Sequence, residues 1–581
     1  MTEPPSPTPK RSIVEVHKEE SRQLRGTIAD ELANSSLDHF SDANKSLIKF
    51  HGTYQQEDRD ARKTRRKEGL GKFYIFMVRC KIPGGYLTPE QYLAVDDLAE
   101  RYANKSLRLT SRQGIQLHGV LKKDLHATIR GINDCLLTTL GACGDVTRNV
   151  MSCPAAFDPV RRELRRQALA VASHFAPRTG AYHEIWLNGK PQTDLVATLN
   201  RPAPADHDQE PIYGKVYLPR KFKIGFGLPD DNCVDIFAQD LGFLAIHERQ
   251  RILGYNVLIG GGMGMTHGNA NTFPFLGREI AWIEPDQVLA AAEAAVKLFR
   301  DHGNRADRKR ARIKYLVHDW GVDRFREIYA GYLPFPLVLP KDVSISGVDL
   351  HHGWHDQGDG KWCLGISIEN GRIQDTADHR LRSGLRDVIA SFRPNLCITP
   401  QQDLLLTDIA PESKLAIDRR LSEYGIRSPE RISLLERYGM ACPAIPTCGL
   451  AISESERALP QLIDQLESVL AELGLEALPI SIRMTGCPNG CVRPYQSDIG
   501  IVGRSGDKYT VFVGGNRLGN RLNFMLCDLV PFHEITPLLA SLFRVYRDER
   551  VGAEGFGDYC HRLGPAAIRQ RAGVSVDATS H

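Results

Sequence analysis

The sequence of 581 residues lacks the features that would place it in several specialised classes of protein. No apolar run reaches the ~18 residues that a membrane-spanning helix needs. The polar, proline-rich residues 1–9 lack the apolar core of a signal peptide. The formal net charge is only +4, which gives no argument for nucleic acid as a partner. We therefore expect a cytoplasmic globular protein of about two to four domains with a substantial core.

A dinucleotide-binding motif is also absent. An apolar strand does run into glycines at residues 257–264, V-L-I-G-G-G-M-G, but the G-x-G-x-x-G spacing and the helical start are missing. We interpret Gly260, Gly261 and Gly262 as bare backbone that approaches a large flat ligand, with a flexible turn as the alternative.

The cysteines do not form the dense, even set of a small secreted scaffold, because 13 of them are spread over a long chain. Four gather in two motifs, C-P-A-I-P-T-C at Cys442 and Cys448 and T-G-C-P-N-G-C at Cys487 and Cys491. We expect the other nine to be buried free thiols in a reducing compartment. They are Cys80, Cys135, Cys143, Cys153, Cys233, Cys363, Cys397, Cys527 and Cys560.

Three interpretations of the four clustered cysteines compete. Zinc sites use C-x2–4-C knuckles, and the five residues between Cys442 and Cys448 are loose for one. Disulfides are disfavoured in a reducing compartment. A [4Fe-4S] cluster needs four thiolates spread over a broad cubane, and the glycines and prolines beside the cysteines would let backbone N–H groups point at its sulfurs. Spacing alone modestly favours the iron–sulfur cluster.

Basic residues in two stretches suggest an anion. Arg108 and Arg112 stand four apart in a strand-and-turn context, and guanidinium groups match carboxylate or phosphate oxygens. Lys221 and Lys223 are two apart in residues 217–226, which we predict to be a strand, so they would share one face. Two ammonium groups on one face repel unless an anion lies between them, although a solvated edge strand is the alternative.

An internal repeat is present. Residues 107–120 align without gaps to residues 396–409, with Leu, Thr, Gln and Leu recurring at four positions. The second copy lacks the basic residues of the first. A duplicated, pseudo-symmetric architecture with one working site would explain both facts.

Periodicity and end signals predict the main elements. Strands are expected at residues 73–78, 479–484, 499–503 and 509–513, and helices at 89–102, 160–176 and 285–302. Ser453 and Glu456 have the spacing of a capping box for the helix that follows, and Thr536-Pro537 resembles the start of a last helix. Residues 190–212 are interpreted as a connection, and the basic run 59–67 as a solvated helix face or a docking surface for an acidic partner.

The cysteine motifs, separated by 38 residues, resemble those of the sulfite and nitrite reductases that couple sirohaem to a [4Fe-4S] cluster. The resemblance runs nearly end to end and is strongest to the haemoprotein (beta) subunits of the assimilatory NADPH-dependent enzymes. Further matching stretches are residues 23–26, 50–56, 79–85, 108–119, 217–223, 514–517 and 555–558. Residues 152–154 depart from the pattern of these relatives, as do Gly449, Val492 and Pro494 near the cluster motifs.

The resemblance implies an α+β fold with three domains and pseudo-twofold symmetry, in which ferredoxin-like half-domains accompany mixed-sheet cofactor domains. The chain would begin with an N-terminal arm at 1–72, of which about the first 12 residues are disordered, and end with a flexible tail at 574–581. The two half-domains would be residues 73–140 and 345–414. A sirohaem- and substrate-binding domain would occupy 141–344, and a [4Fe-4S]/sirohaem domain would occupy 415–573.

The resemblance also implies residue roles. Cys442, Cys448, Cys487 and Cys491 would hold the cluster, and Cys491 would bridge to the sirohaem iron. Arg79, Arg148, Lys221 and Lys223 match residues that bind the anion over the distal face of the haem. The implied sirohaem contacts are Arg108, Arg112, His118, Gly260, Gly261, Gly262, Asn489, Asn516 and Arg517.

The implied activity is the six-electron reduction of sulfite to hydrogen sulfide. The chain has no nucleotide-binding fingerprint or evident flavin domain, so NADPH would act through a flavoprotein (alpha) subunit carrying FAD and FMN, with residues 17–26 as a candidate docking arm. One alternative is a ferredoxin-dependent sulfite or nitrite reductase. A more remote alternative is a metal-stabilised binding protein without catalysis.

Overall fold

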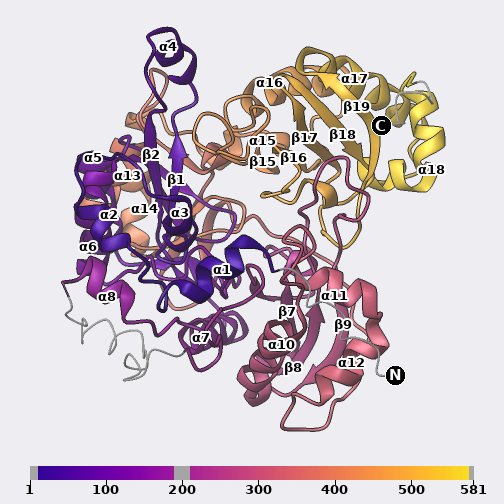
Figure 1. Cartoon of the computed structure of the whole chain (residues 1–581). Helices are drawn as coiled ribbons and strands as arrows, with labels where there is room; N and C mark the ends of the chain where they lie inside the picture. The colour runs from indigo at the N-terminus through magenta and orange to yellow at the C-terminus, as the bar shows by residue number, and fades with distance from the viewer. Residues whose placement is uncertain (1–10, 189–209, 575–581) are drawn as a thin grey trace.

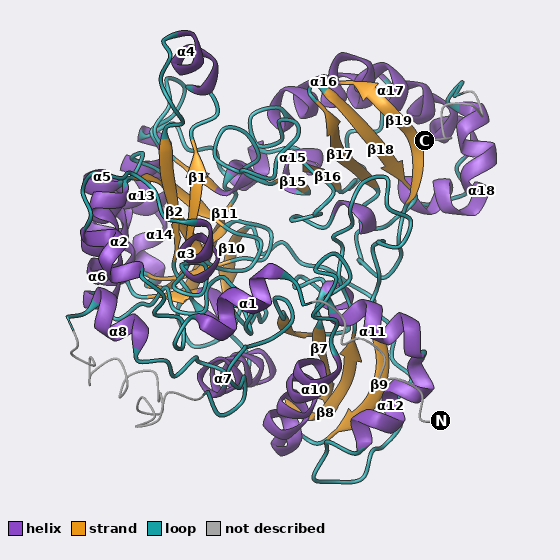
Figure 2. Cartoon of the chain, viewed as in Figure 1, coloured by secondary structure: helices purple, strands orange, loops and turns teal. Residues whose placement is uncertain are grey.

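The computed structural model describes residues 11–188 and 210–574 and shows four sheets with flanking helices (Figures 1 and 2). The predictions for residues 1–10, 190–209 and 575–581 lie outside the described residues. One apolar core runs through the N-terminal half-domains and the sheet of residues 224–283, and a second core fills the C-terminal domain. The predicted α+β class is confirmed.

The first half-domain is a sheet in the order β1-β2-β5-β4-β12. Its own elements are β1 (Thr53–Glu57), β2 (Tyr74–Arg79), β3 (Tyr86–Leu87), β4 (Leu107–Leu109), β5 (Ile115–Val120), α5 (Pro89–Tyr102) and α6 (Leu125–Asp134). Helix α5 starts where the sequence predicts, because Thr88 and Gln91 form a capping box and Pro89 takes the first position. Strand β1 pairs with β2, so residues 53–57 of the predicted N-terminal arm add a strand to this sheet.

The second half-domain repeats the first, in the order β10-β11-β14-β13-β3. Its elements are β10 (Gly353–Asp356), β11 (Trp362–Ile366), β12 (Arg372–Ile373), β13 (Asn395–Ile398), β14 (Leu404–Ile409), α13 (Leu381–Phe392) and α14 (Lys414–Glu423). Ile398 pairs with Leu404 as Leu109 pairs with Ile115, in the register of the sequence repeat. Each half lends the other a strand, because β3 pairs with β13 and β12 with β4.

The predicted N-terminal arm is packed against the rest of the molecule. The helices of the N-terminal region are α1 (Ile13–Glu20), α2 (Ile28–Ala33), α3 (Asp42–Leu47) and α4 (Arg62–Lys67). Leu24 and Phe50 are buried in the main core, and buried Lys18 donates to Leu218 O at 2.9 Å. Helix α4 is exposed, as the basic run predicts, and projects at the top of Figure 1.

The middle domain is a sheet in the order β6-β7-β8-β9, at the lower right of Figure 1. Its strands and the nearby helices are β6 (Ile224–Gly227), β7 (Leu241–Glu248), β8 (Arg251–Ile259), β9 (Arg278–Ile283), α7 (Pro159–His174), α10 (Val288–His302), α11 (Ile313–Trp320) and α12 (Val322–Ala330). Helix α8 (Ala181–Trp186) instead contacts α6 of the first half-domain. The strand predicted from residue 217 starts only at Ile224, since Pro219 has no N–H to donate to a ladder. Residues 221–223 are joined to Thr147 by a single bridge at Phe222.

The C-terminal domain is a sheet in the order β15-β16-β17-β18-β19. Its elements are β15 (Gly439–Ala441), β16 (Ile482–Thr485), β17 (Ile499–Ser505), β18 (Lys508–Val513), β19 (Phe524–Pro531), α15 (Leu434–Arg437), α16 (Leu459–Glu472), α17 (Phe532–Glu549) and α18 (Phe556–Arg571). The helix predicted to start at Thr536 starts at Phe532 and is not the last one. Pro537 lies inside α17, where the packing of Ile535 and Leu539 offsets its cost of about 3 kcal/mol.

Short 3-10 turns connect these elements. They are η1 (Pro83–Gly85), η2 (Lys122–Asp124), η3 (Ile236–Ala238), η4 (Pro285–Gln287), η5 (Glu369–Gly371), η6 (Pro411–Ser413), η7 (Pro429–Arg431) and η8 (Pro494–Gln496). Within the described part of the chain, no helix combines the length and apolar character needed to cross a bilayer.

Candidate cofactor and anion site

Two of the clustered cysteines are brought together by neighbouring strands. Strands β15 and β16 are parallel, with Ala441 opposite Met484, so the loops after them leave the same edge of the sheet. Cys442 therefore lies near the turn that carries Cys487. Gly486 N donates to Cys442 Sγ at 3.4 Å, and Asn489 Nδ2 donates to Cys487 Sγ at 3.4 Å. These are the N–H···S contacts expected around an iron–sulfur cluster.

Burial raises the pKa of three of the clustered thiols. Burial raises the pKa of Cys442 well above its usual value and that of Cys487 to about 12, and the negative charge of Cys491 adds to both shifts. Burial raises the pKa of Cys448 too, again with Cys491 adding to the shift. The free thiols are therefore neutral, and they would bind a metal by losing their protons to become thiolate ligands.

The spacing of the sulfurs separates the two metal interpretations. A tetrahedral zinc ion with Zn–S of about 2.3 Å would hold its sulfurs about 3.8 Å apart. Among the described residues, however, the group whose ligand atoms all lie within 4.8 Å of one another does not include any of these four cysteines. A [4Fe-4S] cluster, with one cysteine on each iron, spans more widely spaced sulfurs than a single zinc ion and is compatible with these loops.

A cluster of cations adjoins Cys491. It contains the predicted residues Arg112, Arg148, Lys221 and Lys223, together with Arg220, Arg312, Lys314 and Arg493, which the sequence did not point out. Burial and the charges of Arg312, Arg220 and Arg148 lower the pKa of Lys221 to about 7, whereas the charge of Cys491 raises it. Burial and Lys221 lower the pKa of Lys223 well below its ordinary value.

Two extended segments hold the cations side by side. Arg148 N donates to Phe222 O at 2.8 Å, so the loop carrying Arg148 runs alongside the segment carrying Lys221 and Lys223. The Arg148 side chain is held by Gly144 O at 2.8 Å. Arg79, at the end of β2, donates to Cys143 Sγ at 3.0 Å in the same loop region.

Several groups in this cluster lack the partners that a buried charge needs. Among the residues that the structure describes, neither Lys221 nor Lys223 has a side-chain hydrogen bond or an ion pair. The buried Nε of Arg112 has no partner, although its Nη1 donates to Gln239 Oε1 at 2.8 Å. Lys221 and Lys223 are half-buried, and positive charges gathered this closely repel one another, so these residues fit a polycarboxylate cofactor and an anionic substrate.

Arg108 has a different role from the one predicted. Its side chain is buried and pairs with Glu456 Oε2 at 2.9 Å, and its Nη2 donates to Ala441 O at 2.7 Å. Glu456 also binds Arg372, at 2.6 Å. The capping-box interpretation of Glu456 is therefore wrong, and α16 begins at Leu459 without a side-chain cap. Arg108 holds the residue before Cys442 and is already neutralised by a carboxylate, so it is not available for sirohaem carboxylates.

The other residues predicted to contact sirohaem lie in different surroundings. His118 is buried, with Nε2 3.1 Å from Gln116 Oε1. A Cβ on Gly261 would lie 2.3 Å from Phe237 O and Gln239 O, so that glycine allows the approach of protein backbone, not of a flat ligand. Asn516 Nδ2 donates to Asn520 at 2.8 Å. Arg517 lines a small cavity with Arg437 and Arg483.

Arg59 is a further residue that the sequence did not indicate. Its Nη1 donates to Ala451 O at 2.5 Å and its N to Pro446 O at 3.3 Å, so the segment between β1 and α4 holds the Cys448 loop.

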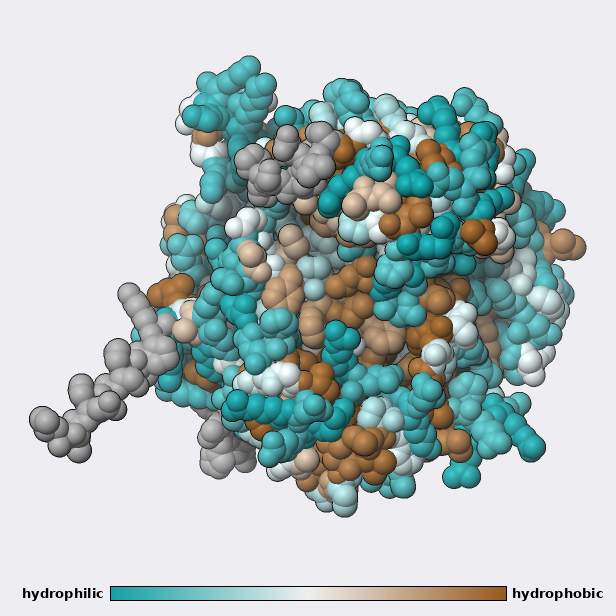
Figure 3. All heavy atoms as spheres, turned by 90° about the vertical axis from the view of Figure 1, so that its right-hand side faces the viewer, coloured by the Kyte–Doolittle hydropathy of each residue, from teal (hydrophilic) through white to brown (hydrophobic). Residues whose placement is uncertain are grey.

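Figure 3 views the side shared by the middle and C-terminal domains, where apolar residues gather in the centre between more polar upper and lower parts.

The fold and the cysteine loops define an iron–sulfur oxidoreductase, and comparisons with known proteins identify the family. The model for the nitrite and sulphite reductase 4Fe-4S domain matches residues 169–337 and 439–577. The model for the nitrite/sulfite reductase ferredoxin-like half domain matches residues 70–135 and 355–424. The chain belongs to the nitrite and sulphite reductase family, which confirms the predicted family and the predicted architecture.

Individual relatives agree over nearly the full length. The chain is 44% identical over 558 residues to a sulfite reductase [NADPH] hemoprotein beta-component of Paenibacillus sp., with 95% of both chains covered. It is also 41% identical to the hemoprotein beta-component of Staphylococcus haemolyticus, with 96% of both chains covered. It is 41% identical to a sulfite reductase [ferredoxin] of Synechococcus elongatus, with 97% of this chain and 91% of the Synechococcus chain covered. The NirA structure of Mycobacterium tuberculosis has the same fold, with a TM-score of 0.75, 22% identity and 95% of both chains covered.

Proposed function

We propose that this chain is the haemoprotein component of an assimilatory sulfite reductase that reduces sulfite to hydrogen sulfide by six electrons. The observation that carries the proposal is the position of the uncompensated cations Lys221, Lys223 and Arg112 beside the cysteine loops. One centre delivers electrons and the other binds an anion, and sulfite reduction needs both. The relatives named sulfite reductase support this choice of anion.

The cysteines and the cations have different roles in the proposed site. Cys442, Cys448, Cys487 and Cys491 would hold the [4Fe-4S] cluster, with Cys491 shared with the iron of sirohaem; when bound, the two groups supply electrons to the substrate sulfur. Arg112 would neutralise sirohaem carboxylates. Asn489 would stay near the cluster sulfurs through its contact with Cys487.

Sulfite would be held by Arg79, Arg148, Lys221 and Lys223. Sulfite carries negative charge, so its binding favours protonated lysines and offsets the repulsion between them. Each S–O bond that breaks releases an oxygen that must leave as water, and this requires protons. With a pKa of about 7, the Lys221 ammonium can donate a proton near neutral pH and be recharged from solvent.

The electron donor is the second part of the proposal. We infer a separate flavoprotein that takes electrons from NADPH, because the sequence at residues 17–26 resembles the flavoprotein-dependent group. A ferredoxin donor is the alternative, favoured by the similarity to the Synechococcus elongatus protein. The buried free thiols Cys80, Cys363 and Cys560 suit work in the cytoplasm, which is reducing.

Neutral substitutions test the lysine roles. Lys221→Met and Lys223→Met should each lower kcat/KM for sulfite by about 100-fold, as expected when a charged group facing the reacting atoms is removed, while iron and sirohaem contents stay near the wild-type values. Lys215→Met is the matched control, because Lys215 is exposed on the same segment, 4.0 Å from Glu19. Unchanged sulfite turnover in either of the first two variants would refute the role of that lysine.

A further inference from the structure

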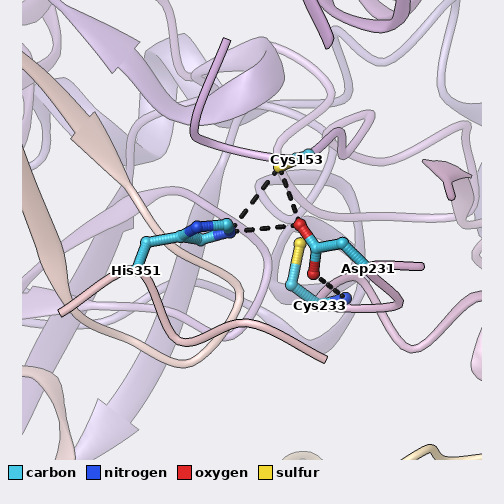
Figure 4. Close-up of side chains that lie close together, drawn as sticks. All are labelled: Cys153, Asp231, Cys233 and His351. Atoms are coloured by element: carbon cyan, nitrogen blue, oxygen red, sulfur yellow. Dashed lines mark hydrogen bonds and ion pairs between the residues drawn. The ribbon is translucent and has the colours of Figure 1, made fainter. Parts of the chain in front are cut away.

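A second group of metal-binding side chains lies outside the cofactor site. Cys153, Asp231, Cys233 and His351 are all buried, and one ligand atom from each lies within 4.8 Å of the others (Figure 4). They come from three segments, namely the loop after Arg148, the turn after β6 and the stretch before β10. Cys153 and Cys233 are buried free thiols, as the sequence predicts, but they belong to one group of metal-binding side chains.

Three distances between the ligand atoms are short enough for the atoms to share one ion, and the S–N distance equals a tetrahedral edge. Cys153 Sγ lies 3.1 Å from Asp231 Oδ2 and 3.6 Å from His351 Nε2, and His351 Nε2 lies 3.2 Å from Asp231 Oδ2. A tetrahedral zinc ion with Zn–S of about 2.3 Å and Zn–N of about 2.1 Å separates sulfur from nitrogen by about 3.6 Å. In Figure 4, the Cys233 sulfur lies beside the Asp231 carboxylate, on the side of the other two ligands.

The surrounding residues orient and neutralise the group. Asp349 Oδ2 lies 3.3 Å from His351 Nδ1, which leaves Nε2 free to act as a ligand, as in carboxylate–histidine–zinc arrangements. Asp349 N donates to Asp231 Oδ1 at 3.1 Å. Two thiolates and one carboxylate on a divalent ion carry a net negative charge, and Arg161 Nη2, 3.8 Å from Asp231 Oδ2, compensates it.

We propose that Cys153, Asp231, Cys233 and His351 bind one structural Zn²⁺ ion. Two thiolates, an imidazole and a carboxylate are ligands that zinc accepts, and four protein ligands in a buried site leave no open position for a substrate. The ion would fasten the segment that follows Arg148 to the stretch before the second half-domain. It would also fix Asp235, which follows Cys233 by two residues and binds Arg483 at 2.9 Å. The proposal does not depend on the anion that the enzyme reduces.

Metal analysis of the purified holoenzyme tests this directly. After dialysis against a weak chelator, we expect one zinc per chain by mass spectrometry, in addition to the iron. Zinc-edge X-ray absorption should show two sulfurs at about 2.3 Å and two lighter atoms at about 2.0–2.1 Å. Cys233→Ala and His351→Ala should each lower the zinc content about tenfold. Cys363→Ala is the matched control and should keep zinc, because Cys363 is buried in the same apolar cluster but is not a ligand.

A last variant separates the new site from the cluster cysteines, which could take up stray zinc. Cys487→Ser should lose iron and keep zinc. Any one of four results would overturn the proposal. They are zinc lost in Cys487→Ser but kept in Cys233→Ala, an all-sulfur zinc shell, a disulfide between Cys153 and Cys233, and wild-type enzyme without zinc. If Cys233→Ala does not fold, the zinc shell of the wild-type enzyme decides.

Discussion

Buried charges in this protein are of two kinds, and the difference separates structural residues from residues of the site. Arg108 and Arg372 share the carboxylate of Glu456, and Arg493 pairs with Asp235. Lys221 and Lys223 have no side-chain partner of this kind in the described part of the chain. Paired charges hold segments together, and unpaired ones indicate where a ligand must supply the opposite charge.

Glu456 offers a test at this scale. The charges of Arg108 and Arg372 overcome the effect of burial and lower the pKa of Glu456 from 4.5 to about 2. Because the folded-state pKa is below the unfolded one, the stabilisation is complete above pH 4.5 and is lost as the pH falls toward 2. Glu456→Gln should therefore cost about 3 kcal/mol of stability at pH 7, seen as a lower unfolding temperature.

The control for that variant is Glu454→Gln. Glu454 pairs with Arg457 on the surface, so its substitution should cost below ~1 kcal/mol. Equal losses in the two variants, or a Glu456→Gln deficit that persists unchanged at pH 3, would contradict the assigned ion pair.

At the scale of elements, the site depends on loops held by distant segments. The Cys448 loop is bound by Arg59, which lies 389 positions away in the chain, between β1 and α4. The Cys442 loop is bound by Arg108 of β4 through Ala441 O. A strand and a connecting segment of the first half-domain thus stabilise the cluster loops of the C-terminal domain.

Removal of the Arg59 contact should loosen the Cys448 loop without unfolding the protein. Arg59→Ala should speed the loss of cluster iron to a chelator or to oxygen by about tenfold, because two charge-assisted hydrogen bonds to loop carbonyls disappear. Arg66→Ala, on the exposed face of α4, is the control and should match the wild type. The measurement is the decay of the visible absorbance of the cluster. Equal decay rates would show that Arg59 does not hold the loop.

Local patterns predicted the elements and the ligands that lie close in sequence. Each of these features can be recognised from a few neighbouring residues. Examples are the Cys442–Cys448 and Cys487–Cys491 spacings, the Lys221–Lys223 pair and the Thr88 cap. Glu456 was misread because S-x-x-E satisfies the capping pattern, whereas the residue that it binds, Arg108, is 348 positions away. The positions of Arg312 and Arg493 at the site also depend on tertiary packing, which local patterns do not encode. The same holds for the contact between Cys153 and His351, which are 198 positions apart.

On the scale of the whole molecule, the two half-domains form one unit because each completes the other's sheet. Strand β12 pairs with β4, and β3 pairs with β13. Residues 53–135 expressed alone should therefore be unfolded or aggregated, since β4 would lose β12 and the short β3 would lose β13. The same segment expressed together with residues 345–424 should yield a folded pair. Amide NMR dispersion of the two preparations distinguishes these cases, and a folded isolated half-domain would show that the exchange is dispensable.

The central claim is that the cationic pocket beside the cysteine loops serves sulfite reduction. The most direct measurement is steady-state reduction of sulfite and of nitrite by the pure holoenzyme, with a reduced viologen dye as electron donor. We predict a higher kcat/KM for sulfite than for nitrite. A clear preference for nitrite would leave the fold and the cofactors in place but contradict the proposed function, and no activity with either anion would contradict the catalytic role of the site.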